Sequence, residues 1–138
     1  MIGVLVIAHS NLAGELVSAA ELIVGKMERV VGVPVTPHQS VEQLRNQIAQ
    51  AIKVVNKGDG VVILTDMFGG TPSNISLSFL EQDKVEVVTG VNLPMVVRVA
   101  TYQGDQKNLK ELAQHIMGYG RDNIYLASEL LQQKDKKR

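Results

Sequence analysis

Short apolar runs alternate with longer amphipathic segments along this 138-residue chain. Runs rich in β-branched residues occupy positions 4–8, 30–35, 61–65 and 85–89, with a shorter run at 123–127. Strands that are apolar at nearly every position are typical of parallel sheets with both faces covered. The pattern therefore predicts four parallel strands and a fifth strand near the C-terminus.

The segments between these strands have helical periodicity. The first should bury one apolar face made of Leu12, Leu16, Ala19, Ala20 and Ile23. Gly25 follows as its stop. The second helix, over 41–55, has Ser40 as its expected N-cap, and a late helix should begin near 109 and end at Gly118.

Residues 93–100 fit either a strand or a helix, and Asn92 followed by Pro94 favours a short helix. The alternation of strands and helices predicts an α/β fold, an open three-layer, mostly parallel sheet with helices on both faces. We found no linker, repeat or low-complexity block. One domain over 1–138 is expected, with a core over 1–120 and a C-terminal strand and helix over 121–138.

Composition narrows the range of functions. The chain is 45% hydrophobic, enough for a substantial core, and it has no cysteine, which excludes disulfides and thiolate chemistry and suits a cytoplasmic protein. The 14 basic and 14 acidic residues balance, so charge indicates neither nucleic acid nor an anionic membrane as a partner. The basic run at 134–138 is interpreted as a solvated end. No signal peptide or membrane span is expected.

Candidate chemistry lies where the predicted strands end. In open α/β sheets, functional groups collect beyond the carboxyl ends of the strands. The first strand ends at His9 and the third leads into Asp66, so we expect the two side chains to be neighbours. A carboxylate bonded to one imidazole nitrogen fixes the tautomer and leaves the other as a general base, metal ligand or nucleophile.

A glycine-rich turn follows Asp66. Gly69 and Gly70 permit close backbone approach, and Thr71 with Pro72 forms a good helix start. The amides of this turn and the Thr71 hydroxyl suit a phosphate. Each feature alone has an ordinary structural explanation as a turn or cap. Their joint presence at one sheet edge favours phosphoryl transfer through a phosphohistidine.

Other kinds of site fit less well. A zinc site needs three protein ligands and only two are apparent, and no G-x-S-x-G nucleophile elbow is present. We therefore expect no metal and no cofactor. His38 is interpreted as structural or solvent-facing, and His115 as a residue at the boundary of the late helix.

Two motifs and a turn carry a family resemblance. IAHSNLAGELVSAAELIVG at 7–25, LTDMFGGTPSNIS at 64–76 and TGVNLPM at 89–95 resemble the EIIA component of the mannose-type (mannose/fructose/sorbose) bacterial sugar phosphotransferase system. The resemblance covers residues 1 to about 120. Two motifs at the right separation are more specific than either alone.

The resemblance implies a cytoplasmic phosphotransferase that accepts a phosphoryl group from the phosphocarrier HPr on His9. The group then passes to an EIIB component for sugar uptake. Asp66 is implied to bind the imidazole Nδ1 and leave Nε2 reactive, while Thr71 and the amides around Gly70 hold the phosphate. A homodimer is also implied, with the strand at 123–127 exchanged between subunits, and contact with the membrane only through transporter partners.

Several alternatives stay open. Met67 and Phe68 would suit docking of HPr and EIIB, or Phe68 would pack under its own loop. A stand-alone regulatory EIIA would use the same chemistry, and the dihydroxyacetone-kinase branch would carry small residues in place of 68–72. A receiver domain phosphorylated on Asp66 fits poorly, because it needs clustered carboxylates to hold magnesium and this chain has no acidic pair after its first strand. A dinucleotide-binding domain also fits poorly, because it needs G-x-G-x-x-G after the first strand and this chain has HSNLAG there.

Overall fold

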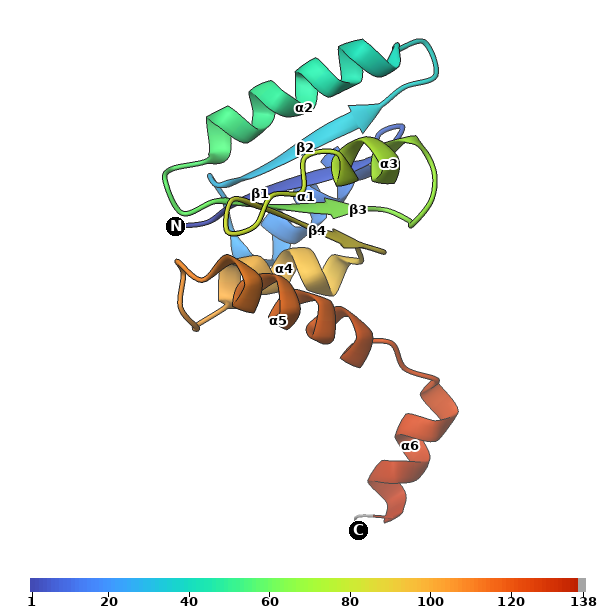
Figure 1. Ribbon diagram of the computed structural model, residues 1–138. Helices are drawn as coiled ribbons and strands as arrows, with labels where there is room; N and C mark the ends of the chain where they lie inside the picture. Colours follow the sequence, from blue (N-terminus) through green and yellow to red (C-terminus); the bar gives the residue numbers. More distant parts are fainter. Residues whose placement is uncertain (137–138) are drawn as a thin grey trace.

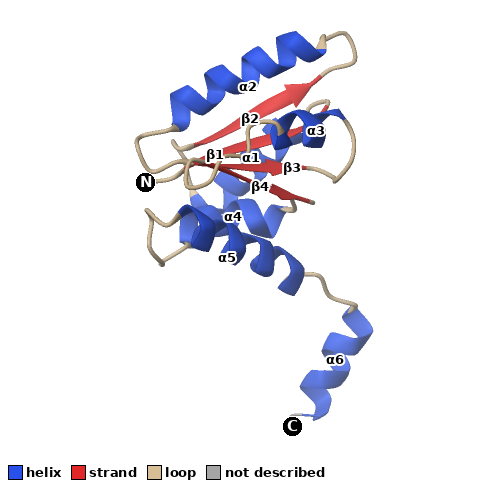
Figure 2. Ribbon diagram, viewed as in Figure 1, coloured by secondary structure: helices blue, strands red, loops and turns tan. Residues whose placement is uncertain are grey.

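The computed structural model describes residues 1–136, which form an α/β fold around a four-stranded parallel sheet of order β2-β1-β3-β4 (Figures 1 and 2). The strands are β1 (Gly3–His9), β2 (Val30–Val35), β3 (Val61–Thr65) and β4 (Val85–Thr89). The helices are α1 (Leu12–Val24), α2 (Val41–Val55), α3 (Thr71–Leu77), α4 (Leu93–Thr101), α5 (Leu109–Asp122) and α6 (Ala127–Lys136). The predicted fold class, the four strands and the helix over 93–100 are confirmed.

The central strand β1 is buried on both faces, which explains its continuous apolar run. Val4, Val6 and Ala8 pack in one cluster with residues of α1, α4 and α5. Leu5 and Ile7 pack in the other cluster, with residues of α2 and α3. All five side chains are 0% exposed. Each aliphatic side chain buried in this way stabilises the fold by about 1.5–3 kcal/mol.

The strand order places the first and third loops side by side. The chain adds β2 on one side of β1 and then crosses to add β3 on the other side. The change of direction lies between β1 and β3, where parallel α/β sheets open a crevice at the carboxyl ends of the strands. In Figure 1 the four arrows point toward the same edge of the sheet.

Local hydrogen bonds define the starts of α2 and α4. The Gln43 N–H donates to the Ser40 hydroxyl and the Ser40 N–H donates to the Gln43 side-chain oxygen Oε1, each at 3.0 Å, a reciprocal capping box. The Asn92 side chain accepts from the Met95 N–H at 3.1 Å. Both predicted helix starts are confirmed.

The predicted buried face of α1 was partly wrong. Leu12 and Ile23 are 45% and 61% exposed, while Ala13 and Ala20 are completely buried. A Cβ placed on Gly32 of β2 would lie 3.0 Å from the backbone of Ala13. Because the helix lies this close to the strand, alanines occupy the positions nearest the sheet, and the larger Leu16 and Val17 pack at the edge of the core.

The predicted end of α5 at Gly118 was also wrong, since the helix continues to Asp122. A Cβ on Gly120 would lie 2.5 Å from the Met95 sulfur, and the Asn92 side chain donates to the Gly120 carbonyl at 3.1 Å. Gly120 therefore permits close packing of α5 on α4, and no helix stop is needed here.

The predicted strand at 123–127 is not a strand in this chain. Residues 124–126 are a loop leading into α6, which extends away from the sheet (Figure 1). The segment pairs with none of the four strands, and Ile124, Tyr125 and Leu126 are 74%, 60% and 63% exposed. The expected C-terminal helix is present. Of the basic run at 134–138, positions 137 and 138 lie outside the described residues.

Candidate functional site

His9 and Asp66 meet at the carboxyl edge of the sheet, as the strand order predicts. His9 is the last residue of β1, and its Nδ1 lies 2.7 Å from Asp66 Oδ2. The backbone N–H of His9 donates to the same oxygen at 3.0 Å. The Met67 N–H donates to Asp66 Oδ1, also at 3.0 Å. One carboxylate thus anchors both the ring and the backbone of the histidine.

The environment keeps this carboxylate charged. Burial acts to raise the pKa of Asp66, but hydrogen bonds from the His9 backbone and ring, with the His9 charge and the Met67 N–H, bring that pKa below its ordinary value. A carboxylate at Nδ1 holds the ring proton there and leaves the lone pair on Nε2. The His9 side chain is 51% exposed and that of Asp66 only 12%. The reactive nitrogen is therefore the accessible one.

The glycine turn borders the free side of the ring. Gly69 and Gly70 have φ angles of +80° and +112°, a region that favours glycine. A Cβ on Gly70 would lie 3.7 Å from Cε1 and 3.9 Å from Nε2 of His9. Gly70 also precedes the first turn of α3, where backbone N–H groups lack intrahelical partners.

A cavity of about 430 Å³ opens beside the ring. It is lined by His9, Ser10 and Thr71, together with the end of β2, the β2–α2 loop and the start of α2. Ser10 was not predicted as a site residue, because no motif marks it, and its unusual φ of +55° appears only in the structure. The buried hydroxyls of Thr65 and Ser73, which have no hydrogen-bond partner among the described residues, were also missed.

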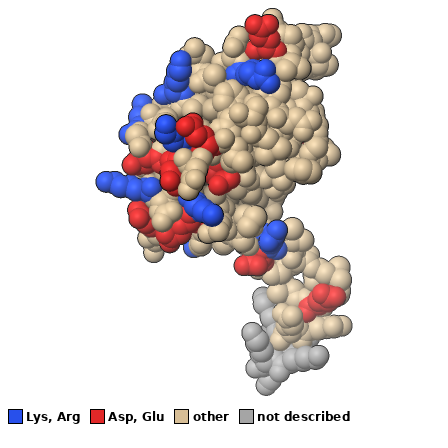
Figure 3. Space-filling view, viewed as in Figure 1, with Lys and Arg blue, Asp and Glu red and all other residues tan. Residues whose placement is uncertain are grey.

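The rim of the site is apolar. Met67 and Phe68 are 56% and 75% exposed, so the alternative that Phe68 packs under its own loop is wrong. Figure 3 shows charged side chains gathered toward the amino ends of the strands. On the side of the carboxyl ends, few are visible in this view apart from those at the start of α2 and near the end of α5.

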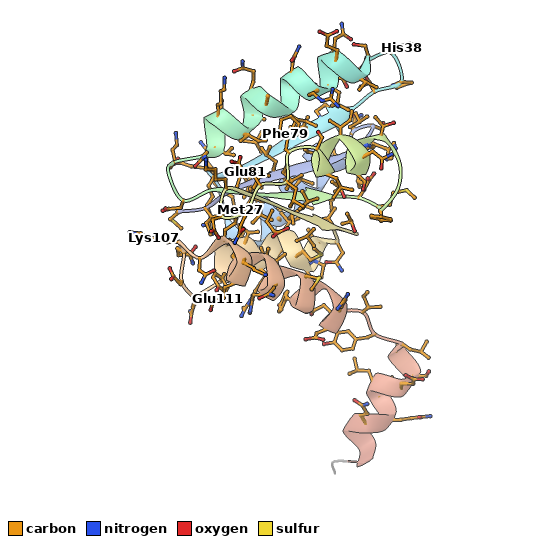
Figure 4. The ribbon with its side chains drawn as sticks, in the orientation of Figure 1. Met27, His38, Phe79, Glu81, Lys107 and Glu111 are labelled. Carbon is orange, nitrogen blue, oxygen red and sulfur yellow. The ribbon has the colours of Figure 1, made fainter. Side chains whose placement is uncertain are left out.

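Neither of the other two histidines lines the cavity beside His9. His38 is an exposed residue of the β2–α2 loop (Figure 4). His115 accepts a hydrogen bond from Arg98 Nε at 2.9 Å and packs against Tyr102, with ring centroids 4.8 Å apart. It therefore links α5 to α4.

Residues 1–136 offer neither a metal site nor a membrane span. They contain no group of three or more histidine, cysteine or acidic side chains placed to hold a metal ion. None of the helices in this part of the chain has the length and apolar character to cross a membrane.

The fold and the site define a class of protein, a parallel α/β domain with a carboxylate-anchored imidazole exposed at its switch point. The family described as "PTS system fructose IIA component" matches residues 3–117. The chain belongs to this family, the mannose-type EIIA components of the sugar phosphotransferase system (PTS). It is thus a phosphotransferase that carries a phosphohistidine in PTS sugar transport.

Individual relatives agree with this assignment. The fructose-specific EIIA component of Bacillus subtilis is 28% identical over 133 residues, which cover 96% of this chain and 90% of that protein. The sorbose-specific EIIA component of Lacticaseibacillus casei is 30% identical over 115 residues, covering 83% and 82%. The crystal structure of an EIIA component from Streptococcus agalactiae has a TM-score of 0.83 at 28% identity, covering 94% of this chain and 99% of that one.

Proposed function

We propose that His9 is the phosphorylated residue, that HPr is the donor and that an EIIB component is the acceptor. The observation that carries this proposal is the 2.7 Å contact between His9 Nδ1 and Asp66, which leaves Nε2 free on a half-exposed ring. A carrier needs a nucleophile that two partner proteins can reach in turn. Both partners would meet this protein in the cytoplasm.

The transfer requires little of the protein beyond positioning and electrostatics. As the Nε2–P bond forms, the N–P bond of the donor breaks and its electron pair returns to the donor ring nitrogen. The proton on His9 Nδ1 stays there, and the Asp66 carboxylate stabilises the positive charge that develops on the ring. The backbone N–H groups around Gly69 and Gly70 and the Thr71 hydroxyl hold the phosphoryl oxygens.

The partners dock on the apolar rim. Met67 and Phe68 are exposed directly beside Asp66, so they reach any protein that approaches His9. The scarcity of charges toward the carboxyl ends of the strands (Figure 3) favours contacts that are largely apolar. The same rim serves donor and acceptor in succession, because both must approach one nitrogen.

The C-terminal segment is proposed to exchange between two copies of the chain. A cavity of about 370 Å³ beside the outer strand β4 is lined in part by apolar Phe68, Leu77 and Val87. Ile124 of the same chain also lines this cavity at one side, and the exposed apolar residues 124–126 have the composition to fill it on a second copy. Sedimentation velocity should show a dimer for the wild type and a monomer for Tyr125→Asp. A wild-type monomer at micromolar concentration would overturn the exchange.

Phosphoenolpyruvate, enzyme I and HPr provide the test of His9. We expect labelling of the wild type and of His38→Ala, no labelling of His9→Ala and slow labelling of Asp66→Ala. The label should be lost in acid and kept in base, unlike an acyl phosphate on Asp66. Chasing the label with candidate EIIB proteins separates a transport component from a purely regulatory one. Full labelling of His9→Ala would show that the proposal is wrong.

A further inference from the structure

The residue after His9 has a strained backbone. Ser10 has a φ of +55°, and Asp83 is the only other non-glycine residue in the described chain with a positive φ. Serine has a Cβ and is disfavoured in this left-handed region, which glycine adopts freely. The turn itself has a role in the fold, because the Ser10 N–H donates to the Val35 carbonyl at 2.9 Å and ties the ends of β1 and β2 together. Glycine would provide that bond without the strain.

The side chain of Ser10 has no comparable role in the fold. It is exposed, and its hydroxyl makes no hydrogen bond to any described residue. It does not cap α1, whose N-cap is Asn11. A side chain kept at a strained position without a structural use indicates a functional one.

The position of Ser10 indicates what that use is. Ser10 lines the 430 Å³ cavity together with His9 and Thr71, and no lysine, arginine, aspartate or glutamate lines this cavity. A phosphoryl group on Nε2 carries about two negative charges. In this cavity only neutral donors, hydroxyls and amides, are available to stabilise them. Each hydroxyl therefore matters more than it would beside a cation.

We propose that the Ser10 hydroxyl donates a hydrogen bond to a non-bridging oxygen of the phosphoryl group on His9. No proton is transferred and no covalent bond to Ser10 forms. The inference rests on the proposed function, since it takes His9 as the phosphorylated residue. It also predicts that loss of this side chain changes folding stability and phosphorylation in opposite directions.

Ser10→Gly and Ser10→Ala separate the two effects. Ser10→Gly should raise the urea midpoint, because it removes the backbone strain. It should also lower the equilibrium constant for phosphorylation from phospho-HPr about tenfold, as expected for the loss of one hydrogen bond to a charged group. Ser10→Ala should show the same loss of phosphorylation without the gain in midpoint. Ser18→Ala, at an exposed serine of α1, is the control for loss of a hydroxyl and should match the wild type in phosphorylation.

A second measurement does not depend on HPr. Phosphoramidate loads exposed histidines directly, and the change in urea midpoint on loading should be less favourable in Ser10→Ala than in the wild type. If Ser10→Ala and the wild type show equal changes in urea midpoint on loading and equal equilibrium constants for phosphorylation, the proposed role of Ser10 is wrong. An effect seen only with HPr would also overturn it, because it would mark a docking contact. If phosphoramidate loads His9 but phospho-HPr does not, the donor assignment fails while Ser10 is still tested. If neither reagent loads His9, both proposals fall.

Discussion

Replacing Asp66 by asparagine tests how the carboxylate prepares the imidazole. Asparagine keeps the shape of the side chain but has one oxygen in place of two, and no charge. If that oxygen takes the Oδ2 position, it can still accept from the backbone and ring of His9, but its NH₂ group then opposes the N–H of Met67. If the amide is flipped, both bonds from His9 are lost.

The size of the effect follows from these contacts. A hydrogen bond to a charged group contributes about 1.5–3 kcal/mol, against about 0.5–1.5 kcal/mol for a neutral one. Two bonds from His9 to Asp66 are weakened together. The expected loss is about 2–3 kcal/mol of stabilisation of the charged ring, or phosphorylation about 30- to 150-fold slower.

Rapid quenching of the reaction with phospho-HPr measures the rate. Nitrogen NMR of His9 measures the tautomer, which should shift from Nδ1–H in the wild type toward Nε2–H in the Asp66→Asn variant. Asp122→Asn is the matched control, because Asp122 is exposed and makes no hydrogen bond to another described side chain. A wild-type rate with an unchanged tautomer in Asp66→Asn would refute the reasoning.

Lowering the pH should weaken the contact between Asp66 and His9, and the effect should be measurable as a loss of folding stability. The pKa of Asp66 is lowered in the fold, so its contribution to stability is present above the unfolded value near 3.9 and is lost as pH falls through the folded value. The wild type should therefore be more stable than Asp66→Asn at pH 6, and the difference in urea midpoint should shrink below about pH 4. A difference independent of pH would mean that the carboxylate charge does not contribute.

Three further predictions concern glycines and a helix cap. Gly70→Ala and Gly69→Ala should each lower the free energy of unfolding by about 1 kcal/mol, because both φ angles are positive. Gly70→Ala, whose methyl lies beside Nε2, should also slow labelling more than tenfold and more than Gly69→Ala does. Equal labelling of the two variants would contradict the site geometry. Gly120→Ala should destabilise the protein by about 1–2 kcal/mol, because the new methyl clashes with Met95. Gly118→Ala has nothing within 4 Å of its new methyl and should stabilise the protein by about 0.5–1 kcal/mol. Thermal denaturation of both variants tests this contrast. Ser40→Ala should cost about 1 kcal/mol through loss of the α2 cap, with urea unfolding as the measurement and an unchanged midpoint as the contrary result.

The strands could be predicted because burial on both faces leaves a strong pattern. Every position of β3, Val61–Thr65, is buried, and this run was identified with its bounds. The pairing of His9 with Asp66 followed from topology, since the third strand lies beside the first. Helix caps such as Ser40 and Asn92 could be predicted because their side chains form hydrogen bonds with the first turn of the helix that directly follows them.

What could not be predicted depended on contacts distant in sequence. Gly118 and Gly120 look alike in the sequence, and only the approach of Met95 distinguishes them. The inward face of α1 is set by Gly32 on another strand. The segment 123–127 has the composition of a strand, but whether it pairs depends on what lies next to it. The strain at Ser10 is a backbone angle that no residue type reveals.

The double anchor on His9 has a consequence for how the protein works over a full cycle. One oxygen of Asp66 holds both the ring and the main chain of the histidine, so the ring is kept in one orientation relative to its own peptide. With His9 as the proposed carrier, receiving and releasing the phosphoryl group require no rotation of the ring and no proton rearrangement. Such a protein imposes no direction of its own: the supply of loaded donor and the demand of empty acceptor decide which way phosphate flows through it.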